Sequence, residues 1–256
     1  MSALRVAVLH PLATAAQGDE GNARVLVRRA ALRGIATTVR TVHDGAVPTA
    51  DLYLVGGLDD GRMPVLAQRL REGGLADRVA DGAVVLAVNA GYQVLGTSFA
   101  TPDGTRHEGL GLLDVWSSRA ATPFLGPVIT RAQPELGLAA LSGYESHSGT
   151  TEVGPGAEPF STLELGHGND GSRDGARQGH VIGTYLHGPL LARNADLADL
   201  LLGWASGAAL DPAPSPTSDA LRAQRITEDR ADPSGWGGRL YGKAKRRSRR
   251  TLRPGR

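Results

Sequence analysis

The residue whose position most strongly suggests chemistry is Asn89, which follows the apolar run 83–88. That run is rich in β-branched residues and begins after Gly82, so it predicts a buried strand, and the segment after Asn89 has the pattern of a helix. In α/β hydrolytic folds such a strand-to-helix turn presents a nucleophile above the carboxyl edge of the sheet. The amide nitrogen of asparagine is delocalised and cannot attack a carbonyl group. The sequence therefore predicts the shape of a nucleophile elbow without the nucleophile.

Two further segments place groups that could take part in catalysis directly after predicted strands. Gly56 and Gly57 follow the strand predicted at 51–55, where backbone N–H groups can approach a ligand and hold an oxyanion. His187 follows the last predicted strand, 181–186. Ligands of parallel sheets bind outside the carboxyl ends of the strands, so we expect Gly57, Asn89 and His187 in one crevice.

The pattern of elements that must position these residues alternates between strands and helices. This alternation predicts an α/β fold: a mostly parallel sheet flanked by helices, as a single domain with a basic tail. Strands are expected at 4–9, 35–42, 51–55, 83–88, 128–131, 141–151 and 181–186, helices at 22–33, 63–71, 190–204 and 218–231, and a hairpin with loops at 154–179. The expected divisions are a domain at 1–206, a Pro-rich linker with a short helix at 207–234, and a disordered tail at 235–256.

Composition excludes several classes of chemistry. The chain of 256 residues contains no cysteine, which rules out disulfides, thiolate metal sites and cysteine catalysis. It contains no stretch near the roughly 20 apolar residues of a membrane span and no signal-peptide pattern, so we expect a cytoplasmic protein. Asp59 and Asp60 are explained by turn chemistry, and neither a metal nor an organic cofactor is expected.

The formal net charge of +2 hides a strong asymmetry. Residues 243–256 carry eight Lys or Arg and no acid, so the other 242 residues have 20 basic and 26 acidic side chains, a difference of −6. A solvated, disordered terminus is the plainer interpretation of this tail. The alternative is contact with anionic lipid at the inner face of the membrane. The tail has no interleaved aromatic residues, which argues against nucleic acid as a partner.

Six segments occur in the order found in class I glutamine amidotransferases of the cobyric-acid-synthase type, and the chain resembles that family over roughly residues 4–230. More narrowly, it is similar to the glutaminase subunit of lipid II isoglutaminyl synthase. Because six ordered motifs take part, the resemblance is far more specific than any one of them. The segments are 18–22, 56–60, 89–96, 109–114, 143–151 and 183–189.

The resemblance implies a defined chemistry. In the family, a cysteine at the elbow is activated by the histidine after the last strand and attacks the side-chain amide of glutamine, while backbone N–H groups hold the oxyanion. The ammonia released passes to a Mur-ligase-like, ATP-dependent partner that amidates D-glutamate in lipid II, the peptidoglycan precursor. The implied assembly is a heterodimer, and glutamine is the implied small molecule.

Mapped by motif, the nucleophile position of the family is Asn89 and the base is His187, with Gly57 and Ala90 as the oxyanion residues. Ala90 replaces a usual glycine. Because Pro189 takes the place of the acid that follows the histidine in other class I members, the third member of a triad is not identifiable.

Further departures lie around the expected glutamine site. Leu58 stands for a usual third glycine, and Pro123 lies where an arginine that holds glutamine is expected, with Arg119 nearby but out of register. Glu145 and His147 lie in a family motif, with a site-shaping role and a purely structural role left open.

These departures lead to a hypothesis of a catalytically inactive amidotransferase subunit, a pseudoenzyme that binds and stabilises the synthetase. Two alternatives remain. One is an active glutaminase subunit whose cysteine was engineered away. The other is a module that senses an amino acid in the vacated crevice.

Overall fold

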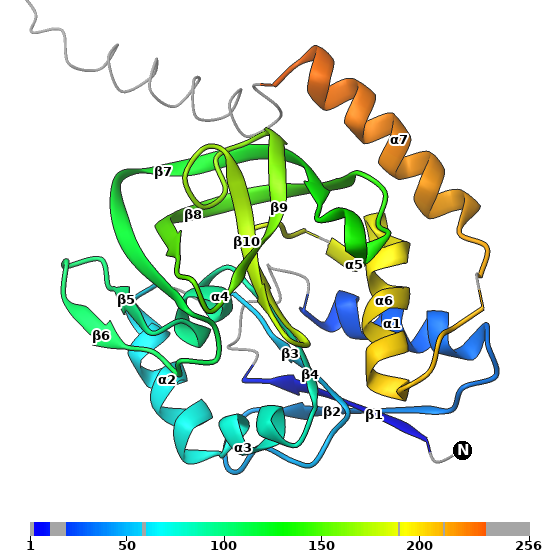
Figure 1. Cartoon of the computed structure of the whole chain (residues 1–256), viewed down its shortest axis with the longest axis horizontal. Coiled ribbons are helices and arrows are strands. Elements are labelled where there is room, and N and C mark those ends of the chain that lie inside the picture. Colours follow the sequence, from blue (N-terminus) through cyan, green and yellow to red (C-terminus); the bar gives the residue numbers. More distant parts are fainter. Residues whose placement is uncertain (1–2, 11–18, 58–59, 189, 212, 234–256) are drawn as a thin grey trace, which may run out of the picture.

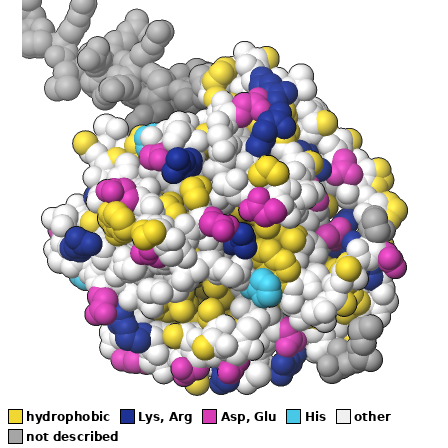
Figure 2. Space-filling view, in the orientation of Figure 1, with side chains coloured by type: hydrophobic (Ala, Val, Ile, Leu, Met, Phe, Trp, Pro, Cys, Tyr) yellow, Lys and Arg dark blue, Asp and Glu magenta, His cyan; other side chains and the backbone are white. Residues whose placement is uncertain are grey.

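The computed structural model describes residues 3–10, 19–57, 60–188, 190–211 and 213–233 (Figure 1). The basic segment 243–256 lies outside these ranges, as do Leu58, Asp59 and Pro189. Within the described ranges, no helix is both long and apolar enough to cross a membrane. Figure 2 shows basic and acidic side chains interspersed on the face in view.

One half of the sheet is parallel and carries the elbow. Its strands follow one another in the order β2, β1, β3, β4 and β11, and each pairs in parallel with its neighbours. Every residue of β3, β4 and β11 is buried, as the apolar runs predicted. The strands span Leu4–Leu9 (β1), Thr37–Val42 (β2), Leu52–Val55 (β3), Val84–Val88 (β4) and Val181–Thr184 (β11).

The other half of the sheet is largely antiparallel. It continues from β11 through β10, β9, β7, β5 and β6, with β8 pairing β7 off this path. The predicted hairpin at 154–179 is confirmed, because β9 and β10 pair antiparallel. The strands span Ser98–Ala100 (β5), Arg106–Glu108 (β6), Val115–Ala132 (β7), Leu141–Val153 (β8), Glu158–Leu165 (β9) and Arg173–Gln178 (β10).

The short strand predicted at 128–131 is wrong as a separate element. It is the end of β7, an 18-residue strand that begins at Val115. The register between β7 and β8 shifts between Arg119 and Phe124, and residues 121–123 in that interval are exposed. This irregularity and the intervening segment Ala-Ala-Thr-Pro, which has no alternation of apolar and polar residues, hide the continuity of the strand from periodicity arguments.

Helices cover both faces of the parallel half, which creates two separate cores (Figure 1). One face packs against α1, α5 and α6, and the other against α2, α3 and α4. The helices span Asp19–Ala31 (α1), Met63–Glu72 (α2), Leu75–Ala80 (α3), Ala90–Leu95 (α4), Leu190–Arg193 (α5) and Ala195–Ser206 (α6), with 3-10 turns at Asp60–Arg62 (η2) and Pro134–Leu136 (η3). The sheet and these two layers have the architecture that the sequence predicted.

The helical segment 190–204 breaks at Asn194, and the reason lies in its side chain. Nδ2 of Asn194 donates to the carbonyl oxygens of Leu190 (2.8 Å) and Ser142 (2.9 Å), and Oδ1 accepts from Ser142 N–H (3.0 Å). The side chain thus ends α5 and fastens it to β8. This anchors the segment that directly follows His187.

A last helix, α7 (Pro216–Ala231), packs across α5 and β8. Oγ of Ser218 donates to Ala192 O (2.5 Å), and Arg222 pairs with Asp196 (2.6 Å). At its far end Arg230 pairs with Glu164. The helix is therefore held against the body at both ends, while the division of the chain at residues 206 and 234 stays a prediction.

Candidate functional site

The elbow at Asn89 has the strained backbone expected of a strand-to-helix turn. Asn89 has φ 59° and ψ −119°, between the buried strand β4 and the start of α4. A positive φ is costly for residues other than glycine and clusters at functional sites. The N–H of Asn89 donates to Thr184 O at the end of β11 (2.9 Å), and its carbonyl accepts from Gln93 N–H (3.2 Å). These bonds fix the turn between the two central strands.

The side chain of Asn89 is buried, with 4% of its surface exposed. Its Nδ2 donates to the carbonyl oxygen of Ser146 on β8 (3.0 Å). The electron pair of an amide nitrogen is delocalised into the adjacent C=O group, so it cannot attack a carbonyl carbon. The elbow residue is thus held against β8 by a side chain that cannot act as a nucleophile.

The carboxyl end of β3 lies directly against the start of α4. A methyl group on Gly91 would lie 2.4 Å from the carbonyl oxygen of Val55 and 2.9 Å from that of Gly56, so only glycine allows this approach. Gly57 and Ala90 are both buried on either side of this contact. The structure therefore brings the ends of β3 and β4 together, while an oxyanion role for Gly57 and Ala90 stays a prediction.

His187 lies beyond the end of β11, the strand next to β4. Its backbone exchanges two hydrogen bonds with Tyr144 (2.9 and 3.0 Å), and its ring contacts the Tyr144 ring edge to face, with centroids 5.9 Å apart. The ring is 8% exposed, and within the described part of the chain neither Nδ1 nor Nε2 has a hydrogen-bond partner. Buried polar atoms usually have a hydrogen-bond partner, and among the described residues these two ring nitrogens have none.

Burial lowers the pKa of His187 to about 4, and the nearby charge of His147 acts in the same direction. The ring is therefore neutral at physiological pH. General bases work best with a pKa near the operating pH, so a ring this reluctant to take a proton is a weak base. The strand ends thus hold a neutral imidazole beside an elbow that has no thiol to activate.

Residues Glu145, Ser146 and His147 of β8 form what we call the site wall, since Ser146 contacts Asn89. Glu145 accepts hydrogen bonds from the N–H groups of His167 (2.8 Å) and Gly168 (2.9 Å). It also faces Nε2 of His147 at 3.3 Å. Glu145 therefore has partners on both of its oxygens.

His147 is equally well satisfied. Its Nδ1 faces the carbonyl oxygen of Gly149 (2.9 Å), which can only accept, so this nitrogen carries a hydrogen. Its Nε2 faces Oε2 of Glu145 at 3.3 Å, so both ring nitrogens have a polar partner and the two side chains form a buried polar pair. The ring also stacks on Tyr185, with centroids 3.7 Å apart. These contacts are those of a rigid wall behind the elbow.

Arg119 and the segment that follows it do not replace the expected arginine near Pro123. Arg119 pairs with Asp60 of η2 (3.0 Å), and both side chains are about a third exposed. This ion pair gives Asp60 a role outside metal binding. Among the described residues, no group of three or more His, Asp or Glu side chains has the arrangement of a metal site.

Two buried groups near the site were missed by the sequence analysis. Asp174 of β10 accepts from Oγ1 of Thr184 and from the N–H of Tyr185 (3.1 Å), and burial raises its pKa to about 6. The hydroxyl of Tyr185 bonds to Oγ1 of Thr151 (2.7 Å). Asp174 lies in a polar segment that resembles any loop, so no local pattern distinguishes it from a surface aspartate.

Comparisons with known proteins agree on one family. A model of the CobB/CobQ-like glutamine amidotransferase domain matches residues 5–195. The chain is 29% identical over 222 residues to "Lipid II isoglutaminyl synthase (glutamine-hydrolyzing) subunit GatD" of Staphylococcus aureus strain N315, covering 84% of this chain and 90% of that protein. The subunit of the same name from Streptococcus pneumoniae R6 is 30% identical over 189 residues, covering 71% of this chain and 72% of that protein.

A cobyric acid synthase of Limosilactobacillus reuteri is 35% identical over 155 residues, which cover 55% of this chain and 29% of that larger protein. Among solved structures, a glutamine amidotransferase has a TM-score of 0.53 at 21% identity, covering 78% of this chain and 98% of its own. A glutamine amidotransferase of Thermotoga maritima has a TM-score of 0.51 at 13% identity and covers 90% of this chain and 94% of its own. At these identities the structures show a shared fold.

Proposed function

Because the chain belongs to the CobB/CobQ-like glutamine amidotransferase family, we propose that it is a glutaminase-type subunit that has lost glutamine hydrolysis and now supports a partner synthetase. The observation that carries this proposal is the residue at the elbow: the strained turn is present, but its side chain is the amide of Asn89, bonded to Ser146 O. Removing the nucleophile of an acyl-transfer enzyme costs on the order of 10⁶ in rate. Binding groups alone do not make up such a loss.

The partner in this proposal is a Mur-ligase-like, ATP-dependent synthetase that amidates D-glutamate in lipid II. The support is the similarity to two proteins named as subunits of lipid II isoglutaminyl synthase. The partner then draws on free ammonia in place of ammonia from glutamine. This work takes place in the cytoplasm at the inner face of the membrane, where the basic tail at 243–256 contacts anionic lipid.

The chemistry at His187 supports the same conclusion. With a pKa near 4 the ring is neutral, and it has no thiol beside it from which to take a proton. In the proposed subunit it is a retained part of the crevice without a catalytic task. Gly57 and Ala90, the oxyanion residues of the family, likewise have no tetrahedral intermediate to hold.

The test compares two nitrogen sources in the complex of the full-length chain with the synthetase that co-purifies with it. We expect lipid II amidation with ammonium and ATP, and no release of glutamate from glutamine. Glutamate release at the rate of cysteine-bearing relatives would refute the loss of activity. Failure of any Mur-ligase-like protein to co-purify would refute the partner.

Asn89→Cys then asks whether the cysteine alone is missing. We expect the variant to stay without glutaminase activity, since Ala90, Leu58 and Pro123 also depart from the family pattern. The measurement is glutamate release by the complex, with Asn89→Ala as a control that offers no nucleophile. Full activity of Asn89→Cys would instead mean that the rest of the site is intact and that only the cysteine was replaced.

A further inference from the structure

The edge strands at the two ends of the sheet differ in how well they are protected from pairing with another strand. At one end, β6 has three residues and carries charges of both signs on Arg106 and Glu108. At the other end, β2 has six residues in unbroken parallel register with β1, and within the described residues it pairs with no other strand. Edge strands are usually shortened, charged or bulged, because unpaired N–H and C=O groups attract other strands. β6 has these protections, whereas β2 has only the single charge of Arg40.

The hydrogen bonds to β1 show which backbone groups of β2 face outward. Leu4 N–H donates to Ala36 O (2.8 Å), and His10 N–H donates to Val42 O (2.6 Å). Successive residues of a strand direct their backbone groups to opposite sides, so 36, 38, 40 and 42 face β1. The N–H and C=O groups of Thr37, Val39 and Thr41 therefore face away from it, as a row of donors and acceptors along the free edge.

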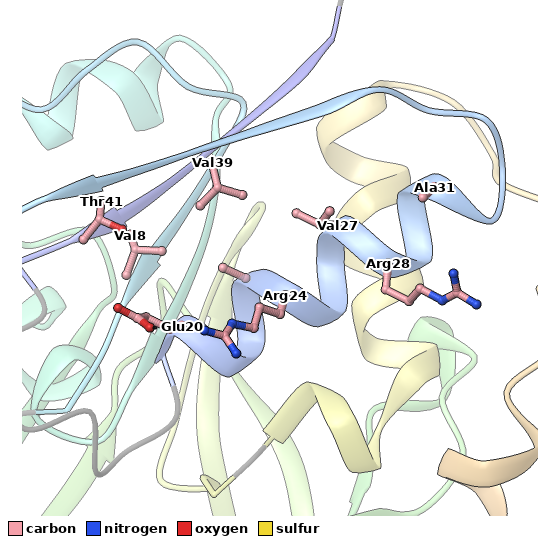
Figure 3. Close-up of a pocket in the computed structure, with 9 residues that line it drawn as sticks. Val8, Glu20, Arg24, Val27, Arg28, Ala31, Val39 and Thr41 are labelled. Carbon is pink, nitrogen blue, oxygen red and sulfur yellow. Dashed lines mark ion pairs between the residues drawn. The ribbon is translucent and has the colours of Figure 1, made fainter.

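Side chains of this row are also exposed to solvent. Val39 is 43% exposed, although it lies in the middle of the strand. Val39 and Thr41 line a groove of about 520 Å³ together with Val27 of α1 (Figure 3). A strand added to this edge would cover Val39 and extend the apolar floor of the groove. Backbone pairing and side-chain burial thus favour the same occupant, an extended strand.

We propose that the strand added at this edge is β2 of a second copy of the chain, antiparallel to the first, with a two-fold axis at Val39. In this register Val39 lies opposite Val39 of the second copy, and Thr37 lies opposite Thr41. On the other face, Arg40 lies opposite Thr38, so no like charges meet. Directly opposed β-branched side chains stabilise an antiparallel pair, and one self-complementary patch generates a closed dimer.

A dimer at this edge leaves the elbow at Asn89 free, because β1 and β3 lie between β2 and β4. It is therefore compatible with a synthetase bound at the carboxyl ends of the central strands.

Cross-linking gives the sharpest test, since the chain contains no cysteine. Opposed residues of a hydrogen-bonded antiparallel pair have Cα atoms about 5.5 Å apart, within the roughly 4.4–6.8 Å that a disulfide spans. We expect full-length Val39→Cys to form a disulfide dimer under mild oxidation. The matched control is Val65→Cys on α2, whose native valine is 47% exposed, and it should form no disulfide-linked dimer.

A mixture of Thr37→Cys and Thr41→Cys tests the register. Each variant should cross-link to the other and not to itself, since only unlike positions are opposed. If Val39→Cys forms dimers no faster than Val65→Cys, the proposal is wrong. Cross-linking of Thr37→Cys to itself would contradict the antiparallel register in the same way.

Two measurements on the cysteine-free chain complete the test. Sedimentation of the unmodified protein should show a concentration-dependent dimer, and the amides of Val39 and Thr41 should exchange hydrogen more slowly as the dimer forms. Val39→Lys should weaken dimerisation at least about tenfold, because it opposes like charges, while Val65→Lys leaves it unchanged. A chain that stays monomeric, or amides that become protected only when another protein is added, would overturn the proposal.

Discussion

The site wall on β8 and His187 beyond β11 both consist of buried polar side chains, but their hydrogen bonding is opposite. Glu145 and His147 have a partner for each oxygen and each ring nitrogen. His187 has none for either ring nitrogen among the described residues. A buried polar group is costly unless it is paired. The hydrogen bonds of the site wall therefore stabilise the fold, whereas the unpaired ring nitrogens of His187 lower its stability.

The largest expected effect comes from the wall. Glu145→Gln keeps the shape of the side chain but replaces one acceptor oxygen by an NH₂ group, so the N–H of His167 or of Gly168 loses its acceptor. A buried donor left without an acceptor costs about 1–3 kcal/mol. We expect a loss of up to about 3 kcal/mol in the free energy of unfolding, measured with denaturant near neutral pH.

The control for Glu145→Gln is Glu158→Gln, which removes an exposed partner of Arg177. Exposed pairs contribute about 1 kcal/mol or less, so this variant should stay close to the unmodified protein. Equal losses in the two variants would mean that the hydrogen bonds to the buried Glu145 carboxyl do not stabilise the fold more than an exposed ion pair does.

His187→Phe tests the other side of the comparison through pH. The pKa of His187 is about 4 in the folded chain, against an ordinary value of 6.5. As pH falls from 6.5 to 4, the unfolded chain takes up this proton and the folded chain does not, so stability is lost. We expect His187→Phe to be at least as stable as the unmodified protein near pH 7, because it removes two unpaired ring nitrogens, and this difference to grow by about 3 kcal/mol on going to pH 4.

Asp174 changes the stability in the opposite direction as the pH falls. Its folded pKa of about 6 lies above the ordinary value of 3.8, so its contribution to stability is present at low pH and is lost as pH rises through 6. Asp174→Asn should therefore lose relative stability on acidification, where His187→Phe gains it. The two differences are read from denaturant unfolding curves at matched pH, and equal slopes for both variants would contradict the assignment.

A smaller effect is expected at the elbow. Gly91→Ala places a methyl group 2.4 Å from Val55 O, which forces α4 away from β3. Overpacking of this kind costs about 1–3 kcal/mol. Gly126→Ala is the control, because no atom lies within 4 Å of its added carbon. We expect Gly91→Ala alone to lower the free energy of unfolding and to widen the crevice.

Much of the architecture could be predicted from local pattern. The apolar runs at 83–88 and 181–186 are buried strands, and the polar segment at 154–179 is a hairpin. The length of β7 could not be predicted, because the register shift between Arg119 and Phe124 interrupts its periodicity. Periodicity describes regular elements, and it fails where the pairing partner, not the strand itself, sets the conformation.

By itself, the sequence determined that the elbow has no nucleophile, because zero cysteines and an asparagine at position 89 are chemical facts that no fold can change. The ordered glycine-rich segments also determined the parallel arrangement of the strand ends. Only the tertiary structure decided how the remaining polar groups are used. Ser146 O accepts from Asn89, and Glu145 accepts from the N–H groups of His167 and Gly168, which are contacts between segments far apart in the chain. Within the described residues, the same packing leaves the ring nitrogens of His187 without a hydrogen-bond partner.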